Sequence, residues 1–111
     1  MAKKAKYLSK RPNVVSAKIT AEKKGKVKIV FKSNKKATGY CVSFFHPGKR
    51  IGVYTKKKKQ IKPHKEYTVK VNIPKDYKKK GERLAINFCL YRNINDTSYF
   101  GKSKEAEIKQ K

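Results

Sequence analysis

The residues from Tyr67 to Ile73 alternate strictly between apolar and polar side chains, and this pattern limits the possible folds more than any other stretch. Such a period of two places all the apolar side chains on one face of a β-strand, whereas an α-helix would scatter them around its circumference. Pro63 before the run and Pro74 after it bound the strand. Because one half-buried strand is not stable alone, the rest of the chain must supply partner strands.

The same alternation recurs along the chain with a spacing near ten residues. It predicts strands over 13–20, 26–32, 38–45, 50–55, 67–73, 82–92 and 98–108, the last interrupted near Gly101. Between them we expect polar turns, a solvated lysine run at 56–59 and a charged loop at 75–81. The side chains expected to face inward are Val15, Ala17, Ile19, Val27, Ile29, Phe31, Tyr40, Val42, Phe44, Ile51, Val53, Leu84, Ile86, Phe88 and Leu90.

Seven short strands without a helix-period segment longer than a turn or two predict an all-β fold, a β-sandwich. One sheet would hold the first, second and fifth strands, and the other the third, fourth, sixth and seventh. A five-stranded barrel of the oligonucleotide-binding type is the alternative, and it would leave two of the strands without a place.

The stretch Ile61-Lys62-Pro63-His64-Lys65-Glu66-Tyr67-Thr68-Val69 resembles the Leu-x-Pro-x-x-x-Tyr-x-Val stretch of fibronectin type III domains, and the strand series resembles the wider immunoglobulin-like group. The resemblance implies a single seven-stranded immunoglobulin-like β-sandwich at 13–111. The basic residues of the first dozen positions, with almost nothing to bury, predict a basic N-terminal arm at 1–12. The chain departs from immunoglobulin domains because its second strand has no cysteine. Small proteins of this architecture also resemble auxiliary, or decoration, subunits of tailed-phage capsids, which implies a structural role on a virion.

Charge is the second constraint, because 32 lysines and arginines against 7 acids give a net charge of +25 on 111 residues. Such an excess attracts polyanions, although an AT-rich genome also enriches lysine without selection for binding. We expect the protein to bind, through its lysines, an acidic protein surface of a larger assembly, such as a major capsid protein. The alternative is that it binds nucleic acid, as a ribosome-associated or single-strand-binding protein does. The predicted polyanion-binding residues are Lys3, Lys4, Lys6, Lys10, Arg11, Lys28, Lys32, Lys56, Lys57, Lys58, Lys59, Lys70, Lys78, Lys79 and Lys80.

A nearly uncharged outer face is predicted on the sheet of the third, fourth, sixth and seventh strands. Strand parity points Cys41, Ser43, Phe45, Ala85, Asn87, Cys89 and Tyr91 outward there. Protein interfaces are depleted of charge and enriched in aromatics, so Phe45, Tyr54 and Tyr91 are predicted interface residues. The other interpretation is that central strands simply carry less charge than edges, and the aromatic side chains could also stack bases.

Chemistry other than binding has little support in the sequence. Cys41 and Cys89 share outward parity on neighbouring strands, so they are either a disulfide or two semi-buried thiols, and a reducing compartment favours thiols. The two histidines, His46 and His64, lack ligand spacing to a cysteine, so we expect no metal or other cofactor. No acid pair lies in an apolar run and no nucleophile elbow occurs, which predicts a non-enzymatic protein without a small-molecule substrate.

Without a signal peptide or membrane-spanning run, the expected location is a virion or the cytoplasm, and no membrane partner is expected.

Overall fold

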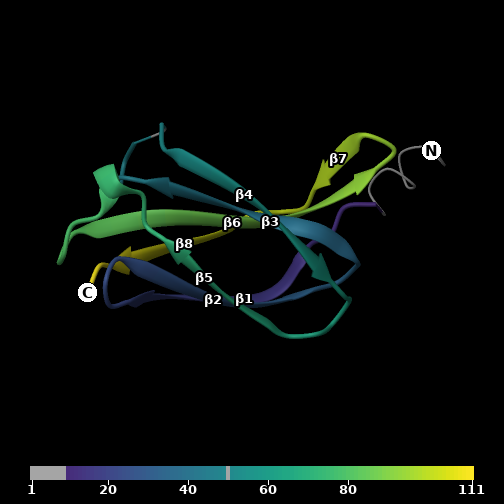
Figure 1. Cartoon of the computed structure of the whole chain (residues 1–111), viewed down its shortest axis with the longest axis horizontal. Coiled ribbons are helices and arrows are strands. Elements are labelled where there is room, and N and C mark those ends of the chain that lie inside the picture. Colours follow the sequence, from purple (N-terminus) through teal and green to yellow (C-terminus); the bar gives the residue numbers. More distant parts are fainter. Residues whose placement is uncertain (1–9, 50) are drawn as a thin grey trace.

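The computed structural model describes residues 10–49 and 51–111, and the protein is all-β, as predicted (Figure 1). One turn of 3₁₀ helix, η1 (Lys75–Tyr77), is the helical element of these residues. Their strands are β1 (Val14–Glu22), β2 (Lys26–Ser33), β3 (Ala37–Phe45), β4 (Val53–Ile61), β5 (Tyr67–Asn72), β6 (Arg83–Ile94), β7 (Thr97–Phe100) and β8 (Lys104–Lys109). None of the helical structure in the described chain is long and apolar enough to cross a membrane.

Two antiparallel sheets form the layers of a sandwich (Figure 1). The smaller sheet has the order β1-β2-β5, and the larger sheet has the order β4-β3-β6-β7, with β8 also paired to β6. The predicted division of the strands between the sheets is therefore confirmed. Two separate sheets do not form the single closed barrel that was the alternative.

The predicted last strand is divided into β7 and β8, which makes eight described strands where seven were expected. Strand β6 pairs with β8 along its first half and with β7 along its second half, both on the edge that β3 does not occupy. Gly101 lies at the predicted break, where a Cβ would collide with the backbone carbonyl of Pro12. The amide of Lys102 donates to Asn13 Oδ1 at 3.0 Å, so the segment before β1 is attached at this break.

The core lies between the sheets and consists of the alternating side chains that the sequence predicts. Phe31 from β2 and Phe88 from β6 meet across the layers with ring centroids 4.9 Å apart, and Tyr40 from β3 lies 5.8 Å from Phe88. Tyr67 at the start of β5 stacks on Phe31 at 5.8 Å. The apolar residues that are buried include Val27, Ile29, Phe31, Tyr40, Val42, Phe44, Val69, Val71, Ile73, Leu84, Ile86, Phe88 and Leu90. Their burial confirms the predicted inward faces of the second, third, fifth and sixth strands.

The prediction for the fourth strand is wrong in position. Strand β4 spans Val53–Ile61 instead of 50–55, so the lysines at 56–59 lie within a strand and not in a solvated run after it. Ile51, predicted to face inward, is 87% exposed, and Val53 is also exposed. Strand β4 is an edge strand, which can carry lysines because their methylenes cover apolar surface while their ammonium groups stay in water.

The inward assignment of Val15 is also wrong. The β1–β2 register shifts between Val14 and Ser16, which is the mark of a β-bulge. An extra residue reverses the alternation, so Val14 packs against the core while Val15 is 57% exposed. Beyond the shift, Ala17 and Ile19 pack against the core as predicted.

Candidate functional site

Five lysines line a hollow of about 680 Å³ at the end of the sandwich where the chain terminates, and we call this hollow the lysine cleft. The β1–β2 turn, the loop after η1 and the C-terminus provide its walls. Gly25 and Gln110 complete the lining, which contains no aspartate or glutamate side chain. The lysines of the lysine cleft are Lys23, Lys24, Lys78, Lys80 and Lys111.

The turn on one side of the lysine cleft has a defined conformation. Lys24 and Gly25 both have left-handed backbone angles, with φ of 65° and 67°. That region is uncommon for a lysine and costs about 1–2 kcal/mol, so a tight three-residue connection holds Lys24 there. The Gly25 carbonyl accepts a 2.8 Å hydrogen bond from the amide of Ile73, and the methylenes of Lys78 fill the space beside Gly25.

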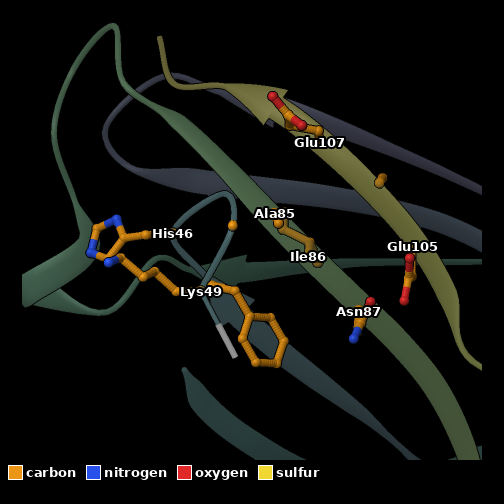
Figure 2. Close-up of a pocket in the computed structure, with 10 residues that line it drawn as sticks. His46, Lys49, Ala85, Ile86, Asn87, Glu105 and Glu107 are labelled. Atoms are coloured by element: carbon orange, nitrogen blue, oxygen red, sulfur yellow. The ribbon is translucent and has the colours of Figure 1, made fainter. Parts of the chain in front are cut away.

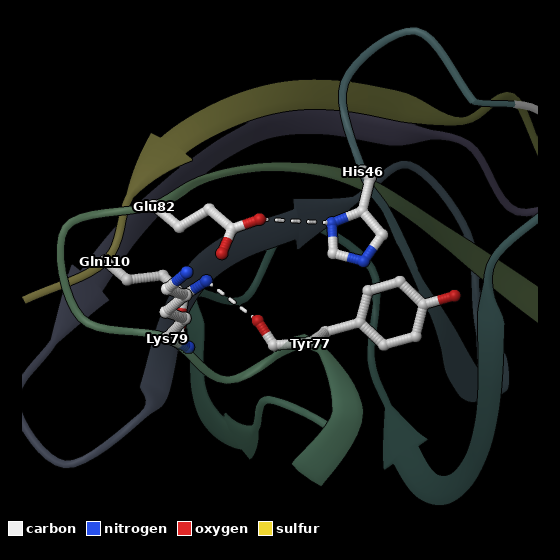
Figure 3. Close-up of polar contacts among 5 residues, drawn as sticks. All are labelled: His46, Tyr77, Lys79, Glu82 and Gln110. Carbon is white, nitrogen blue, oxygen red and sulfur yellow. Dashed lines mark hydrogen bonds and ion pairs between the residues drawn. The ribbon is translucent and has the colours of Figure 1, made fainter.

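Gln110 attaches the loop on the other side (Figure 3). Its side chain accepts a hydrogen bond from the amide of Lys79 at 2.8 Å and donates to the carbonyl of Tyr77 at 2.9 Å. Its backbone accepts from the amide of Gly81 and donates to the carbonyl of Glu82. Because the Gln110 residue is 4% exposed, these hydrogen bonds satisfy a buried amide and hold Lys78 and Lys80 in place.

The His46 turn contacts the same loop (Figure 3). The rings of His46 and Tyr77 stack with centroids 4.5 Å apart, and His46 Nδ1 lies 3.5 Å from Glu82 Oε1. These contacts hold Tyr77, and with it η1, against the larger sheet. The lysine cleft is therefore built on anchored elements, although its lysine side chains are exposed.

We expect Gln110→Ala to lower the free energy of unfolding by about 1–3 kcal/mol, because it removes the buried partner of the Lys79 amide and the Tyr77 carbonyl. Urea denaturation measures the loss, and amide hydrogen exchange at Lys79 should become faster. Gln60→Ala is the matched control, since Gln60 is exposed on β4 and should change stability by less than about 0.5 kcal/mol. Equal effects of the two variants would contradict the anchoring role.

The lysines predicted to bind polyanions are distributed over several surfaces. Lys28, Lys32 and Lys70 point outward from the smaller sheet. Lys18, which is not among the predicted binding residues, lies on the same surface, and we call this surface the basic sheet face. Lys28 lies directly opposite Lys70, an arrangement of like charges that destabilises a sheet. The lysines of β4, Lys56 to Lys59, follow the edge of the larger sheet. Lys78 and Lys80 line the lysine cleft, and Lys79 lies between them in the same loop.

The predicted binding residues of the arm are described only from residue 10 onward. The side chain of Arg11 donates from Nη1 to the carbonyl of Phe100 at 3.0 Å, and Lys10 Nζ lies 5.5 Å from the ring centroid of Tyr99. Both residues therefore lie against β7. Lys3, Lys4 and Lys6 are outside the described residues.

Sequence reasoning missed Lys23, Lys24 and Lys111 as members of a site. The available signal was the pair of lysines before Gly25 at the end of β1, which marks an exposed turn rich in charge. Lys23 and Lys24 lie near Lys78 and Lys80, more than fifty residues away in the chain, because β2 pairs with β5 and the amide of Ile73 donates to the carbonyl of Gly25.

The predicted interface residues differ in accessibility. Tyr54 is 55% exposed and Phe45 is half-buried, so both contribute surface. Tyr91 is buried and does not, because it packs against Gly39 and lies beneath Lys56, whose Nζ is 4.4 Å from the ring centroid. Burial raises the pKa of Tyr91, and its hydroxyl donates to the carbonyl of Lys57 at 3.3 Å.

The outer face of the larger sheet carries more charge than predicted. The β8 residues Glu105 and Glu107 lie opposite Asn87 and Ala85, at one border of the face, and Lys56 and Lys58 lie at the other. A hollow of about 580 Å³ lies among these glutamates, His46 and Lys49, as Figure 2 shows. The addition of the last strand to this sheet places the acids there.

The two carboxylates at that hollow do not resemble an acid–base pair. Both are exposed, and Glu107 lies 3.5 Å from Arg83 Nη1. A general acid is usually buried, in a setting that favours its neutral form. Among residues 10–49 and 51–111, no three His, Cys, Asp or Glu side chains gather in a way that could hold a metal ion.

Cys41 and Cys89 are brought together as the strand assignment predicts. They lie directly opposite each other in the β3–β6 pair, and both are free thiols. The Sγ of Cys41 lies 3.0 Å from the hydroxyl oxygen of Tyr54 on β4. Cys41, Cys89 and Tyr54 lie on the outer face of the larger sheet, away from the lysine cleft.

The fold defines the protein as an all-β sandwich of two antiparallel sheets. No protein-family model matches the sequence, and a search of the curated proteins finds no match.

Proposed function

We propose that the protein is a non-enzymatic interaction subunit that binds an acidic protein surface of a larger assembly through its lysines. The lysine cleft is the observation that carries this proposal. Five lysines line one hollow whose lining has no acidic side chain, and the mutual repulsion of their charges costs folding free energy. A carboxylate-rich partner removes that cost on binding, so the arrangement is suited to an anionic ligand.

The type of cation favours carboxylates on a protein over specific readout of nucleic acid. Lysine is a compact point charge, whereas arginine provides the planar fork that recognises phosphate and guanine bidentately. Burial of Tyr91 also removes one of the aromatic side chains that could stack on bases. The exposed ring of Tyr54 and the half-buried ring of Phe45 would supply apolar contacts that orient the partner.

An immunoglobulin-like subunit on a tailed-phage capsid is one assembly that fits this proposal. The support is architectural: an all-β sandwich, a large positive charge and a lysine-rich composition typical of an AT-rich genome. The acidic partner would then be the major capsid protein. Fold analogy alone connects this chain to that setting.

Nucleic-acid binding, as by a ribosome-associated or single-strand-binding protein, is the second candidate, and the basic sheet face favours it. Outward lysines on three adjacent strands, with Lys28 directly opposite Lys70, form a flat positive surface. Such a surface can follow a phosphate backbone without reading its sequence.

Fluorescence anisotropy with labelled polyglutamate, single-stranded RNA and duplex DNA at physiological ionic strength separates the two candidates. We expect saturable binding of polyglutamate, and no mobility shift with generic nucleic acid under the same conditions. A strong, salt-sensitive shift with RNA or DNA and no binding of polyglutamate would support the second candidate. Binding of none of the probes would overturn both.

A further inference from the structure

The two cysteines of the chain occupy a position that suits a covalent link. Cys41 on β3 and Cys89 on β6 are directly opposite each other in an antiparallel pair and have the same outward orientation. Directly opposite Cβ atoms are separated by about 4.5–5.5 Å in such pairs, and a disulfide requires about 3.5–4.5 Å. Because the two residues are directly opposite on one face of the sheet, their thiols lie side by side. A small adjustment of the strands would therefore allow a disulfide to form.

The edge strand β4 places two groups that stabilise a thiolate beside Cys41. Lys56 lies directly opposite Cys41 on the side away from Cys89, and the hydroxyl oxygen of Tyr54 is 3.0 Å from its sulfur. The hydrogen bond from Cys89 lowers the pKa of Cys41 most, and the hydrogen bond from Tyr54 and the positive charge of Lys56 lower it further. Together they outweigh burial, and the pKa of Cys41 falls to about 7. Burial and the contact with Cys41 raise the pKa of Tyr54, which keeps its phenol protonated as a donor.

Cys89 has the complementary protonation state. Its hydrogen bond to Cys41, and secondarily its burial, raise the pKa of the Cys89 thiol. The pair therefore combines one sulfur that ionises near neutral pH with one that retains its proton. A thiolate beside a second thiol is the arrangement in which oxidation ends in a disulfide rather than in higher sulfur acids.

We propose that Cys41 and Cys89 form a redox-active thiol pair that a hydroperoxide closes into a cross-strand disulfide. The Cys41 thiolate attacks one oxygen of hydrogen peroxide, the O–O bond breaks, and the products are a sulfenic acid and hydroxide, which takes a proton to become water. The sulfur of Cys89 then attacks the Cys41 sulfur and displaces a second water, with the Cys89 proton carried away on that oxygen. Both sulfurs are oxidised, each by one electron, and one peroxide is reduced to two waters.

Accessibility selects the class of oxidant. Cys41 is 2% exposed and lies beside Tyr54 at the sheet edge, whereas Cys89 is half-buried. Hydrogen peroxide is small enough to reach a thiolate in such a setting, while a bulky disulfide would need Tyr54 to move away. The closed link would join the two strands at the centre of the larger sheet, and it is independent of the lysine cleft.

The test treats the reduced 111-residue chain with hydrogen peroxide and follows intact mass, free thiols and thermal unfolding. We expect loss of two hydrogens per monomer, loss of both free thiols and a rise in Tm of about 5–10 °C, all reversed by dithiothreitol. Unchanged mass, disulfide-linked dimers, or sulfinic acid on unlinked cysteines would overturn the proposal.

Two variants separate the steps. Cys89→Ser removes the resolving thiol, so peroxide should leave a sulfenic acid on Cys41 that a dimedone probe traps. Tyr54→Phe removes a thiolate hydrogen bond and should slow loss of the first thiol severalfold while the disulfide still forms. A folded Cys89→Ser variant, verified by circular dichroism, that gives no trapped sulfenic acid would exclude Cys41 as the attacking sulfur.

Discussion

Replacing Phe88 with alanine is expected to lower the free energy of unfolding by about 3–5 kcal/mol. Phe88 is fully buried at the centre of β6 and contacts Phe31 of the opposite sheet and Tyr40 of the neighbouring strand. Removal of the Phe88 ring leaves a cavity between the two sheets, and the surrounding structure can fill it only in part. Domains of this size have about 5–15 kcal/mol of stability in total, and self-repulsion at +25 reduces it further, so the variant should be only marginally folded.

Urea denaturation followed by circular dichroism measures this effect, because the midpoint should fall while the slope stays near that of the parent protein. Val15→Ala is the control, since Val15 is an exposed apolar residue on β1 and its truncation should cost less than about 0.5 kcal/mol. A loss below about 1 kcal/mol for Phe88→Ala would mean that the two sheets do not pack as described.

Reversal of four charges at the lysine cleft should weaken the binding of polyglutamate about 100-fold. The variant changes Lys23, Lys24, Lys78 and Lys80 to glutamate. Each reversal at an exposed site is worth up to about 1 kcal/mol, and a tenfold change in Kd corresponds to about 1.4 kcal/mol. The salt dependence of the remaining affinity should also become shallower, because fewer counterions are released.

A second variant with the same net charge controls for long-range attraction. It changes Lys62, Lys65, Lys102 and Lys104, which are exposed and outside the lysine cleft, to glutamate. At physiological ionic strength the screening length is about 8 Å, so these distant reversals should reduce affinity by less than about tenfold. Equal losses in the two variants would show that total charge, and not the lysine cleft, determines binding.

Strand faces were predictable from the sequence wherever one side of a strand is buried and the other is wet. In β2, β5 and β6 the period of two is uninterrupted, so Ile29, Val71 and Phe88 were assigned correctly to the core. The predicted faces are wrong where a local irregularity changes the register, as at Val15, and where an edge strand needs little burial, as in β4. In those places backbone pairing with the neighbouring strand decides the structure.

The membership of the candidate sites was less predictable. Lysine content identified polyanions as the class of partner, but Lys23, Lys24 and Lys111 join Lys78 and Lys80 only because a turn, a loop and the chain end meet at one edge of the sandwich. Tyr91 was predicted to be a surface residue and is not one. Its side chain points outward from the sheet as predicted, but Lys56 covers its ring.

The sequence by itself therefore determined an all-β sandwich, its division into sheets and its positive charge, because alternation and composition are properties of short segments and of the whole chain. Only the tertiary structure decided which lysines line a common hollow, which aromatic rings reach the surface, and that a tyrosine and a lysine lie beside the paired thiols. Those arrangements depend on contacts between distant segments, and local sequence patterns carry no record of distances between elements.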